Sequence, residues 1–249
     1  MSLTPLVRLV LLGLAAVLLF LVALLLLQRK LLYFPTHHTE TNGLTPWQIN
    51  GQLTGYARLV AHPQNIWLLA HGNGGQAADR SYALSCFSPR DSVYILEYPG
   101  YGSRPGSPSK QSFDAAAIHA YRWLRKTYPA LPVCAVGESI GSGPAALLAQ
   151  QPQPPDKIVL VVPFDALVKV ARRHYPWLPV GLLLQDRWDN IAALRGYHGP
   201  VEIFAARDDQ IIPASHAEEL ARLMPGSALH LIPGGHNDWS QSGAVTIRR

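Results

Sequence analysis

The sequence predicts an α/β fold: one mostly parallel sheet with helices on both faces and a small cap, preceded by one N-terminal transmembrane helix. Three observations predict it. Short apolar runs alternate with helix-like segments along the 249 residues. Polar, glycine-containing clusters follow directly after these runs, as expected where sites form at the carboxyl ends of parallel strands. An uncharged apolar stretch comes before all of them.

Length and composition allow one sizeable domain and exclude two with separate cores. We expect a membrane anchor over residues 1–30, an exit segment over 31–50 and one α/β domain over 51–249. The net charge is +5 without a long basic run, so we expect no nucleic-acid partner. Cys86 and Cys134 lack metal-ligand spacing, and Cys134 is expected as a buried free thiol. A disulfide between the two is the alternative.

The anchor is predicted from Leu9 to Leu27, nineteen residues without a charge. About 20 such residues span the hydrocarbon core of a bilayer. A cleaved signal peptide is the alternative, but its apolar region normally has about 7–15 residues and ends at small residues. Here the run ends in leucines followed by Gln28, Arg29 and Lys30, which favours an uncleaved anchor. Arg8 stands on the other side, so charge does not decide the orientation.

The elements follow in order after the anchor. An extended pair is expected over 47–50 and 52–61 around Gly51. Further apolar strands are expected over 65–70, 92–98, 133–136, 157–162, 201–206 and 228–232, and helices over 111–128, 144–149 and 214–224. Strands that alternate with helices in this way indicate a mostly parallel sheet covered on both faces.

The central motif is Gly137-Glu138-Ser139-Ile140-Gly141, between a strand-like run and a helix-like run. In this context the pentapeptide predicts a nucleophile elbow, in which a strained turn lifts the serine hydroxyl out of the sheet. Side chains at the glycine positions would collide with the neighbouring strand and helix. A glycine-rich loop with an incidental serine is the alternative.

A serine hydroxyl needs a base to take its proton and a third group to orient that base. His236, directly after the last strand, is the candidate base, and an acid is expected between Ser139 and it in the chain. Asp208 and Asp209 both follow the 201–206 strand and are chemically equal.

The cluster His71-Gly72-Asn73-Gly74-Gly75 follows another central strand. Its glycines let backbone N–H groups approach an oxyanion, and we assign the two donors to Asn73 and Ile140. His71 itself is expected to be structural. A phosphate loop is disfavoured because neither the Gly-Lys-Ser/Thr ending nor Gly-x-Gly-x-x-Gly is present.

Together these motifs resemble the α/β-hydrolases, in particular the membrane-anchored group of yeast bud-emergence-type hydrolases, mammalian α/β-hydrolase-domain proteins and bacterial serine aminopeptidase-like relatives. The resemblance spans about Leu31 to Asp238. The matching pieces are Leu31-Leu32-Tyr33-Phe34-Pro35, His71-Gly72-Asn73-Gly74, Tyr98-Pro99-Gly100-Tyr101-Gly102 with Gly106-Ser107-Pro108-Ser109, Gly137-Glu138-Ser139-Ile140-Gly141, Arg207-Asp208-Asp209-Gln210-Ile211-Ile212-Pro213 and Gly235-His236-Asn237-Asp238.

The resemblance implies Ser139, Asp209 and His236 as the catalytic triad. In the family pattern the acid stands three residues before a hydrophobic-Pro end, which fits Ile212-Pro213 and favours Asp209 over Asp208. Members usually carry a closing helix after the histidine. Here residues 237–249 lack an amphipathic pattern, so we expect thin cover over that flank of the sheet.

The predicted function is a membrane-anchored serine hydrolase that cleaves a carboxylic ester or thioester of an acylated or lipid-like substrate through an acyl-enzyme. A serine peptidase and a catalytically silent anchored interaction protein are the alternatives. No cofactor or metal is expected, and the chain is expected to be a monomer.

The cap segment 164–197 is rich in Trp, Pro and Leu, which predicts either an apolar acyl-binding wall or packed core helices. The resemblance suggests an exoplasmic, in bacteria periplasmic, catalytic domain.

Overall fold

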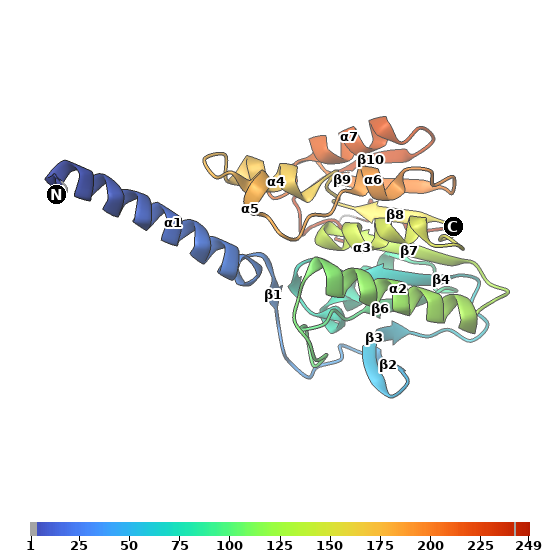
Figure 1. Ribbon diagram of the computed structural model, residues 1–249. Coiled ribbons are helices and arrows are strands. Elements are labelled where there is room, and N and C mark those ends of the chain that lie inside the picture. Colours follow the sequence, from blue (N-terminus) through green and yellow to red (C-terminus); the bar gives the residue numbers. More distant parts are fainter. Residues whose placement is uncertain (1–3, 242) are drawn as a thin grey trace.

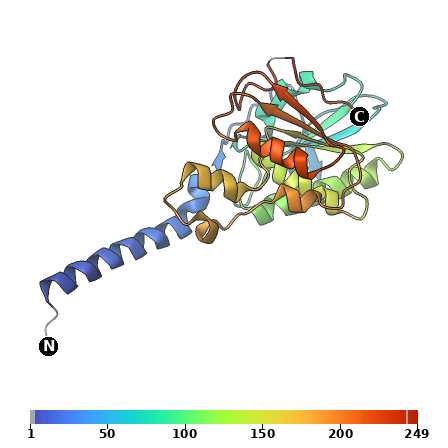
Figure 2. The same cartoon turned by 90° about the horizontal axis from the view of Figure 1, so that it is seen from above.

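The protein consists of one projecting helix and one globular body (Figures 1 and 2). The computed structural model describes residues 4–241 and 243–249. Helix α1 (Pro5–Leu32) has 28 residues and buries none of them. By length and composition it is a helix able to cross a membrane. Residues 1–3 of the expected anchor lie outside the described residues. The assignment of residues 1–30, 31–50 and 51–249 to separate parts stays a prediction, and the large sheet already begins at Thr45.

The body is built on an eight-stranded sheet in the order β10-β9-β8-β7-β4-β6-β3-β2. The hairpin of β2 and β3 turns around Gly51, and β3 pairs antiparallel with β6. The pairs that join β6, β4, β7, β8, β9 and β10 are parallel, which confirms the predicted fold class. The strands are β2 (Thr45–Ile49), β3 (Gln52–Arg58), β4 (Ile66–Ala70), β6 (Ser92–Leu96), β7 (Val133–Glu138), β8 (Ile158–Val161), β9 (Val201–Ala206) and β10 (Ala228–Ile232).

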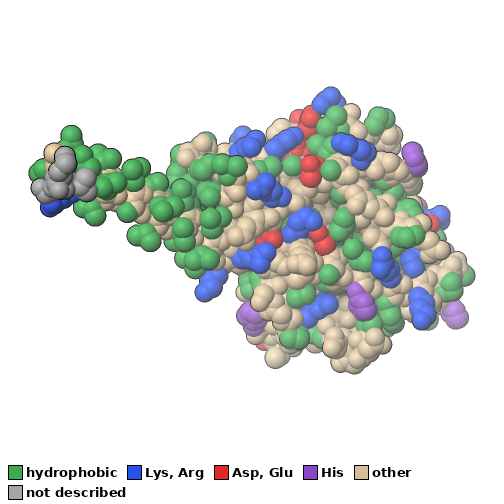
Figure 3. All heavy atoms as spheres, in the orientation of Figure 1, with side chains coloured by type: hydrophobic (Ala, Val, Ile, Leu, Met, Phe, Trp, Pro, Cys, Tyr) green, Lys and Arg blue, Asp and Glu red, His purple; other side chains and the backbone are tan. Residues whose placement is uncertain are grey.

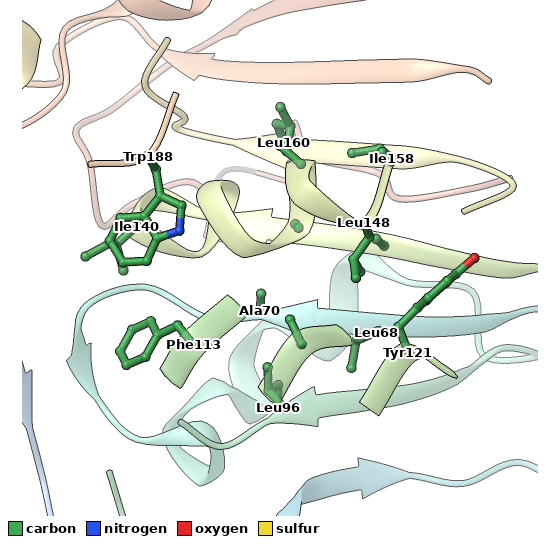
Figure 4. Packing of buried hydrophobic residues seen from close by; sticks show 14 of the residues in the cluster. Leu68, Ala70, Leu96, Phe113, Tyr121, Ile140, Leu148, Ile158, Leu160 and Trp188 are labelled. Atoms are coloured by element: carbon green, nitrogen blue, oxygen red, sulfur yellow. The ribbon is translucent and has the colours of Figure 1, made fainter. Parts of the chain in front are cut away.

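The central strands are apolar along their whole length because both faces of the sheet are covered. Every residue of β4, β6, β7 and β8 is buried. Helices α2 (Lys110–Thr127) and α3 (Ser142–Leu147) pack on one face, where Phe113, Tyr121 and Leu148 meet Leu68 and Leu160 of the strands (Figure 4). On the other face lie the 3₁₀ segment η1 (Ala77–Cys86) and the C-terminal tail.

The C-terminal tail packs on one face of the sheet without a helix, while the last strand β10 is thinly covered, as expected: only Ile232 of its five residues is buried, and Leu231 is 43% exposed. Trp239, Val245 and Ile247 are buried in the second core cluster. Ile247 forms a bridge with Phe87, and Lys157 donates a hydrogen bond to the Arg248 carbonyl oxygen. A few apolar side chains, spaced along the tail, therefore complete the second core cluster without a closing helix.

The remaining elements are short helices and one small sheet. Helices α4 (Leu167–His174), α5 (Val180–Leu183) and α6 (Asn190–Leu194) form the cap, and α7 (Ala214–Leu223) follows β9. Strands β1 (Phe34–Pro35) and β5 (Gly74–Gly75) form a separate small parallel sheet. Cys134 is a buried free thiol, as expected, and so is Cys86; burial raises the pKa of Cys134 to about 12.

Candidate active site

Ser139 sits in a strained turn directly after β7. Its φ is 53°, a left-handed conformation that side chains other than glycine rarely adopt. A Cβ at Gly137 would lie 2.6 Å from Ser142 Cα, and one at Gly141 would lie 2.1 Å from the Ala70 carbonyl oxygen. The two flanking glycines are therefore required by close packing against β4 and α3, as the elbow motif predicts.

The structure brings the three predicted residues into one hydrogen-bonded line. His236 Nε2 lies 2.8 Å from Ser139 Oγ, and His236 Nδ1 lies 2.7 Å from Asp209 Oδ2. The backbone N–H groups of Ile211 and Ile212 donate to the other carboxylate oxygen of Asp209, at 2.8 and 2.7 Å. These bonds hold the Asp209 carboxylate in the orientation that meets His236. Asp209 is 4% exposed.

Asp208 occupies a different position from its neighbour. It is exposed, and its backbone N–H donates to the Gly234 carbonyl oxygen at 3.1 Å. Asp209 faces the histidine because the chain turns immediately after β9. The geometry thus agrees with the family spacing that favoured Asp209.

The two predicted oxyanion donors, the backbone N–H groups of Asn73 and Ile140, belong to residues that line the same cavity as Ser139 and His236. The side chain of Asn73 is already engaged. Its amide donates to the carbonyl oxygen of Leu32, and its own oxygen accepts from the Tyr101 hydroxyl at 2.9 Å. Such a fixed side chain orients the backbone of the loop, which is what an oxyanion donor requires.

The exit segment also holds the loop from His71 to Gly75, here called the proposed oxyanion loop, through its backbone. Phe34 and Pro35 of β1 pair with Gly74 and Gly75 of β5. The Thr36 N–H then donates to the Gly75 carbonyl oxygen at 3.1 Å. The chain that leaves α1 is therefore part of the site as well as a connection.

His71 takes the structural position expected for it. It is fully buried between Tyr98 and Tyr101, whose rings lie 4.4 and 5.7 Å from its own. Its Nε2 lies 3.5 Å from Glu97 Oε1, without hydrogen-bond geometry. It does not line the cavity that Ser139 lines.

A buried carboxylate next to the serine was missed from the sequence. Glu138 accepts from the Gly72 N–H at 2.9 Å, Arg80 Nε at 3.0 Å, the Tyr82 hydroxyl at 3.0 Å and the Trp239 indole at 3.2 Å. Burial opposes its ionisation, but Arg80 and the other donors outweigh burial and hold the pKa of Glu138 below its ordinary value. The one signal in the sequence was a charged residue inside an otherwise small and apolar pentapeptide.

Glu138 joins the parts that have to be aligned for the proposed chemistry. Its donors come from the proposed oxyanion loop, from η1 and from the tail that follows His236. The carboxylate therefore links the elbow, the Asn73 loop and the His236 loop at one point behind Ser139.

The site opens into a cavity of about 670 Å³. Its apolar walls come from the end of α1, the exit segment, the start of the cap and the loop after β9. The apolar residues that line it are Leu32, Phe34, Ile140, Phe164, Leu167, Val170, Ile211 and Ile212.

The cap supplies this wall through α4 and through Phe164, which comes just before it. The Trp- and Leu-rich residues that suggested an acyl-binding wall do not line the cavity. Trp188 is buried in the core, and Trp177 is 68% exposed. That interpretation was thus wrong for these side chains, and the core-packing alternative holds for Trp188.

Comparison with known sequences finds relatives over most of the chain. No family model matches. An uncharacterized protein of Mycobacterium tuberculosis is 34% identical over 233 residues, which cover 85% of this chain and 81% of that protein. The lysophosphatidylserine lipase ABHD12 of Danio rerio is 26% identical over 181 residues, 64% of this chain and 47% of the lipase.

Solved structures share the architecture at low sequence identity. TT1662 from Thermus thermophilus superposes with a TM-score of 0.62 at 17% identity, covering 81% of this chain and 93% of its own. The Pyrococcus furiosus esterase Pf2001 superposes with a TM-score of 0.62 at 12% identity, covering 84% of this chain and 91% of its own. These likenesses establish the fold.

Proposed function

Because this chain belongs to the α/β-hydrolase superfamily and is esterase- or lipase-like within it, we propose that it is a serine hydrolase that works through an acyl-enzyme. The observation that carries the proposal is the continuous line from Ser139 through His236 to Asp209, with both contacts below 3 Å. The bond cleaved is a carboxylic ester or thioester.

The reaction follows from the placement of these groups. His236 Nε2 takes the proton of Ser139 Oγ as that oxygen attacks the carbonyl carbon. The negative charge that develops on the carbonyl oxygen is held by the N–H groups of Asn73 and Ile140. His236 then returns the proton to the departing alkoxide or thiolate, which leaves an ester on Ser139. Water, deprotonated by His236, attacks that ester, and breakdown releases the acid and restores the serine proton.

Asp209 acts on His236 throughout this sequence. Its Oδ2 accepts the Nδ1–H and keeps the Nε2 lone pair directed at Ser139. It also stabilises the imidazolium formed in each step. Since its other oxygen is fixed by two backbone N–H groups, the carboxylate does not rotate away.

The substrate class follows from the cavity and its place in the molecule. Its volume and the apolar part of its lining suit one acyl chain. Leu32, the last residue of α1, and Phe34 in β1 belong to that lining, so a substrate held in a membrane has a short path to Ser139. Relatives described as lysophosphatidylserine lipases support a lipid-like ester.

The same proposal includes the anchor. We infer that α1 is an uncleaved single-pass helix and that the catalytic body lies on the exoplasmic or periplasmic side. Protease treatment of intact spheroplasts, followed by blotting for a C-terminal tag, tests the side. Full protection of the tag would place the body in the cytosol, and carbonate-soluble protein that lacks its N-terminus would indicate a signal peptide.

Labelling with a fluorophosphonate probe tests the activity. The full chain should be labelled, and Ser139→Ala should not. Ser240→Ala is the matched control, because Ser240 lines the same cavity without contact to the proposed base. Labelling of folded Ser139→Ala at the wild-type level would overturn the assignment of the nucleophile.

A further inference from the structure

Three exposed side chains of the cap have the composition of a membrane-contacting surface. Tyr175, Trp177 and Leu182 are 52%, 68% and 82% exposed, and none of them lines the catalytic cavity. The ring of Trp177 stacks on the ring of Phe20 in α1, with centroids 6.5 Å apart and planes 23° apart. A loop of the body therefore reaches back along the apolar helix.

The depth of Phe20 in a bilayer follows from helix geometry. The 28 residues of α1 measure about 42 Å, whereas the hydrocarbon core is about 30 Å thick and takes up about 20 residues. Suppose that the part of α1 inside the hydrocarbon core begins at Pro5, the first residue of the helix. That part then ends near Leu24 and still includes Phe20. If that part of the helix begins at a later residue, Phe20 lies deeper in the hydrocarbon core. The ring against which Trp177 stacks is thus inside the hydrocarbon or at its edge.

The cap is fixed in this place by polar bonds to the end of α1. Gln28 donates to the Leu183 carbonyl oxygen at 3.1 Å and accepts from the Gln185 N–H at 2.8 Å. Arg29 pairs with the buried Asp186 at 2.9 and 3.2 Å. The position of the cap relative to the membrane is therefore set by contacts within the chain.

Three arginines lie near the exposed apolar side chains of the cap in the sequence. Arg172, Arg173 and Arg187 are exposed and lie within the same stretch of sequence. Figure 3 shows hydrophobic side chains that continue from the projecting helix onto the adjoining end of the body, with blue side chains beside them. Aromatic and aliphatic groups flanked by arginines are the composition that binds the interface of an anionic leaflet.

We propose that this cap surface, formed by Tyr175, Trp177, Leu182, Arg172, Arg173 and Arg187, enters the interface of the anionic phospholipid leaflet from which the C-terminal end of α1 emerges. The proposal rests on the membrane anchor proposed above. Helix α4, which carries Val170 and His174 of the cavity lining, leads directly into this surface. The cap therefore holds the mouth of the cavity against the lipids, and an acyl chain reaches Ser139 without crossing water.

Depth measurement in nanodiscs tests the surface. Cysteines are placed singly at Leu182, at Leu18 in α1 and at Leu223 in α7, each labelled with a nitrobenzoxadiazole dye in the full chain. The native Cys86 and Cys134 are buried, and serine replaces them if they react. The discs contain phosphatidylcholine and phosphatidylglycerol with brominated acyl chains. We expect quenching at positions 18 and 182 and none at 223, an exposed leucine at the end of α7, a helix that packs on β9 and β10.

The pattern of quenching separates the possible failures. Quenching at position 18 but not at 182 overturns the cap proposal alone. No quenching at 18 overturns the anchor and the cap proposal together. Labelling of Ser139 by fluorophosphonate, measured in the same discs, reports the proposed activity independently of both.

A second measurement asks whether the surface delivers substrate. Trp177→Ser combined with Leu182→Ser should lower hydrolysis of a long-chain ester embedded in the discs by roughly tenfold, since apolar interfacial area is lost. Hydrolysis of a soluble short-chain ester should stay within about twofold of wild type, because neither residue lines the cavity. Leu223→Ser is the matched control. Equal effects of the double substitution on both substrates would overturn the proposal.

Discussion

At the scale of single residues, the proposed acid provides the sharpest test of the site. Asp209→Asn keeps the volume but replaces one carboxylate oxygen by a donor, which favours the wrong tautomer of His236. We expect the turnover of a short p-nitrophenyl ester to fall by up to roughly ten-thousand-fold with the fold retained. Asp208→Asn is the matched neighbour and should change turnover little, since Asp208 is exposed. The opposite ranking would place the acid one residue earlier.

Glu138 combines a buried charge with hydrogen bonds to the loop that carries Asn73, to η1 and to the tail after His236. Glu138→Gln leaves Arg80, itself buried, without its counter-charge. Breaking one half of a buried pair costs about 3–5 kcal/mol, so the free energy of unfolding should fall by about that amount. Glu138→Gln with Arg80→Met removes both charges and should recover part of the loss. Equal chemical-denaturation midpoints for the single and double variants would contradict this account.

The residues of the proposed triad could be picked out from the sequence, and Glu138 could not, for a physical reason. Ser139, Asp209 and His236 each stand at the carboxyl end of a strand, where short-range patterns are informative. The role of Glu138 depends on Gly72, Arg80, Tyr82 and Trp239, which come from three distant parts of the chain. No local spacing indicates such a convergence.

At the scale of elements, the end of α1 is joined to the loop that carries Asn73, the proposed oxyanion loop. Asn73→Ala keeps the backbone N–H proposed as oxyanion donor but removes the link to the Leu32 carbonyl oxygen. We expect kcat to fall by roughly tenfold or more while KM changes little, because the loss of an entire donor costs about a hundred- to a thousandfold. Tyr101→Phe removes only the second bond to Asn73 and should cost less. A change confined to KM would indicate a role in binding instead.

A buried carboxylate joins the cap to α7 and makes their packing depend on pH. Asp165 accepts from His216 Nδ1 at 2.7 Å and from Lys169 Nζ at 2.5 Å. Burial alone would raise its pKa, but these partners lower the pKa of Asp165 from 3.8 to about 2. Because the folded-state pKa is the lower one, the stabilisation is complete above about pH 4 and disappears as the pH falls towards 2.

The shift corresponds to about 2 kcal/mol at neutral pH. Asp165→Asn should therefore be clearly less stable than wild type at pH 7, and the difference should shrink below pH 4. Urea unfolding of both chains in detergent at pH 7 and near pH 3 measures it. A difference that does not change between the two would show that the carboxylate acts by packing alone.

The elements themselves were predicted well where the burial of their side chains leaves a regular pattern in the sequence. The buried strands were recognisable because burial on both faces leaves a continuous apolar run, and helix α2 because burial of one stripe leaves apolar residues three and four positions apart. The C-terminal tail was not, because Trp239, Val245 and Ile247 are spaced irregularly and find their partners across the fold. The cap was placed correctly, but its apolar side chains divide between the cavity, the core and the outer surface.

At the scale of the whole molecule, the projecting helix is joined firmly to the body. Asp186 is 4% exposed and accepts from Arg29 and from the Tyr33 hydroxyl, the latter at 3.0 Å. Burial, reinforced by Asp186, raises the pKa of Tyr33 above its ordinary value, so the hydroxyl remains a donor. One buried carboxylate thus orients α1 relative to the cap and to the cavity that Leu32 lines.

Removing that carboxylate should loosen the helix without unfolding the body. In Asp186→Ala the Arg29 side chain, which is 47% exposed, turns to solvent, so no charge is left buried. We expect the distance distribution between spin labels at Val22→Cys in α1 and Leu223→Cys in α7 to broaden in pulsed paramagnetic resonance measurements in nanodiscs. Glu218→Ala, in an exposed turn of α7, is the control and should keep the narrow wild-type distribution. A narrow distribution in Asp186→Ala would show that the bonds of Gln28 and the stacking of Trp177 on Phe20 suffice to hold the two parts together.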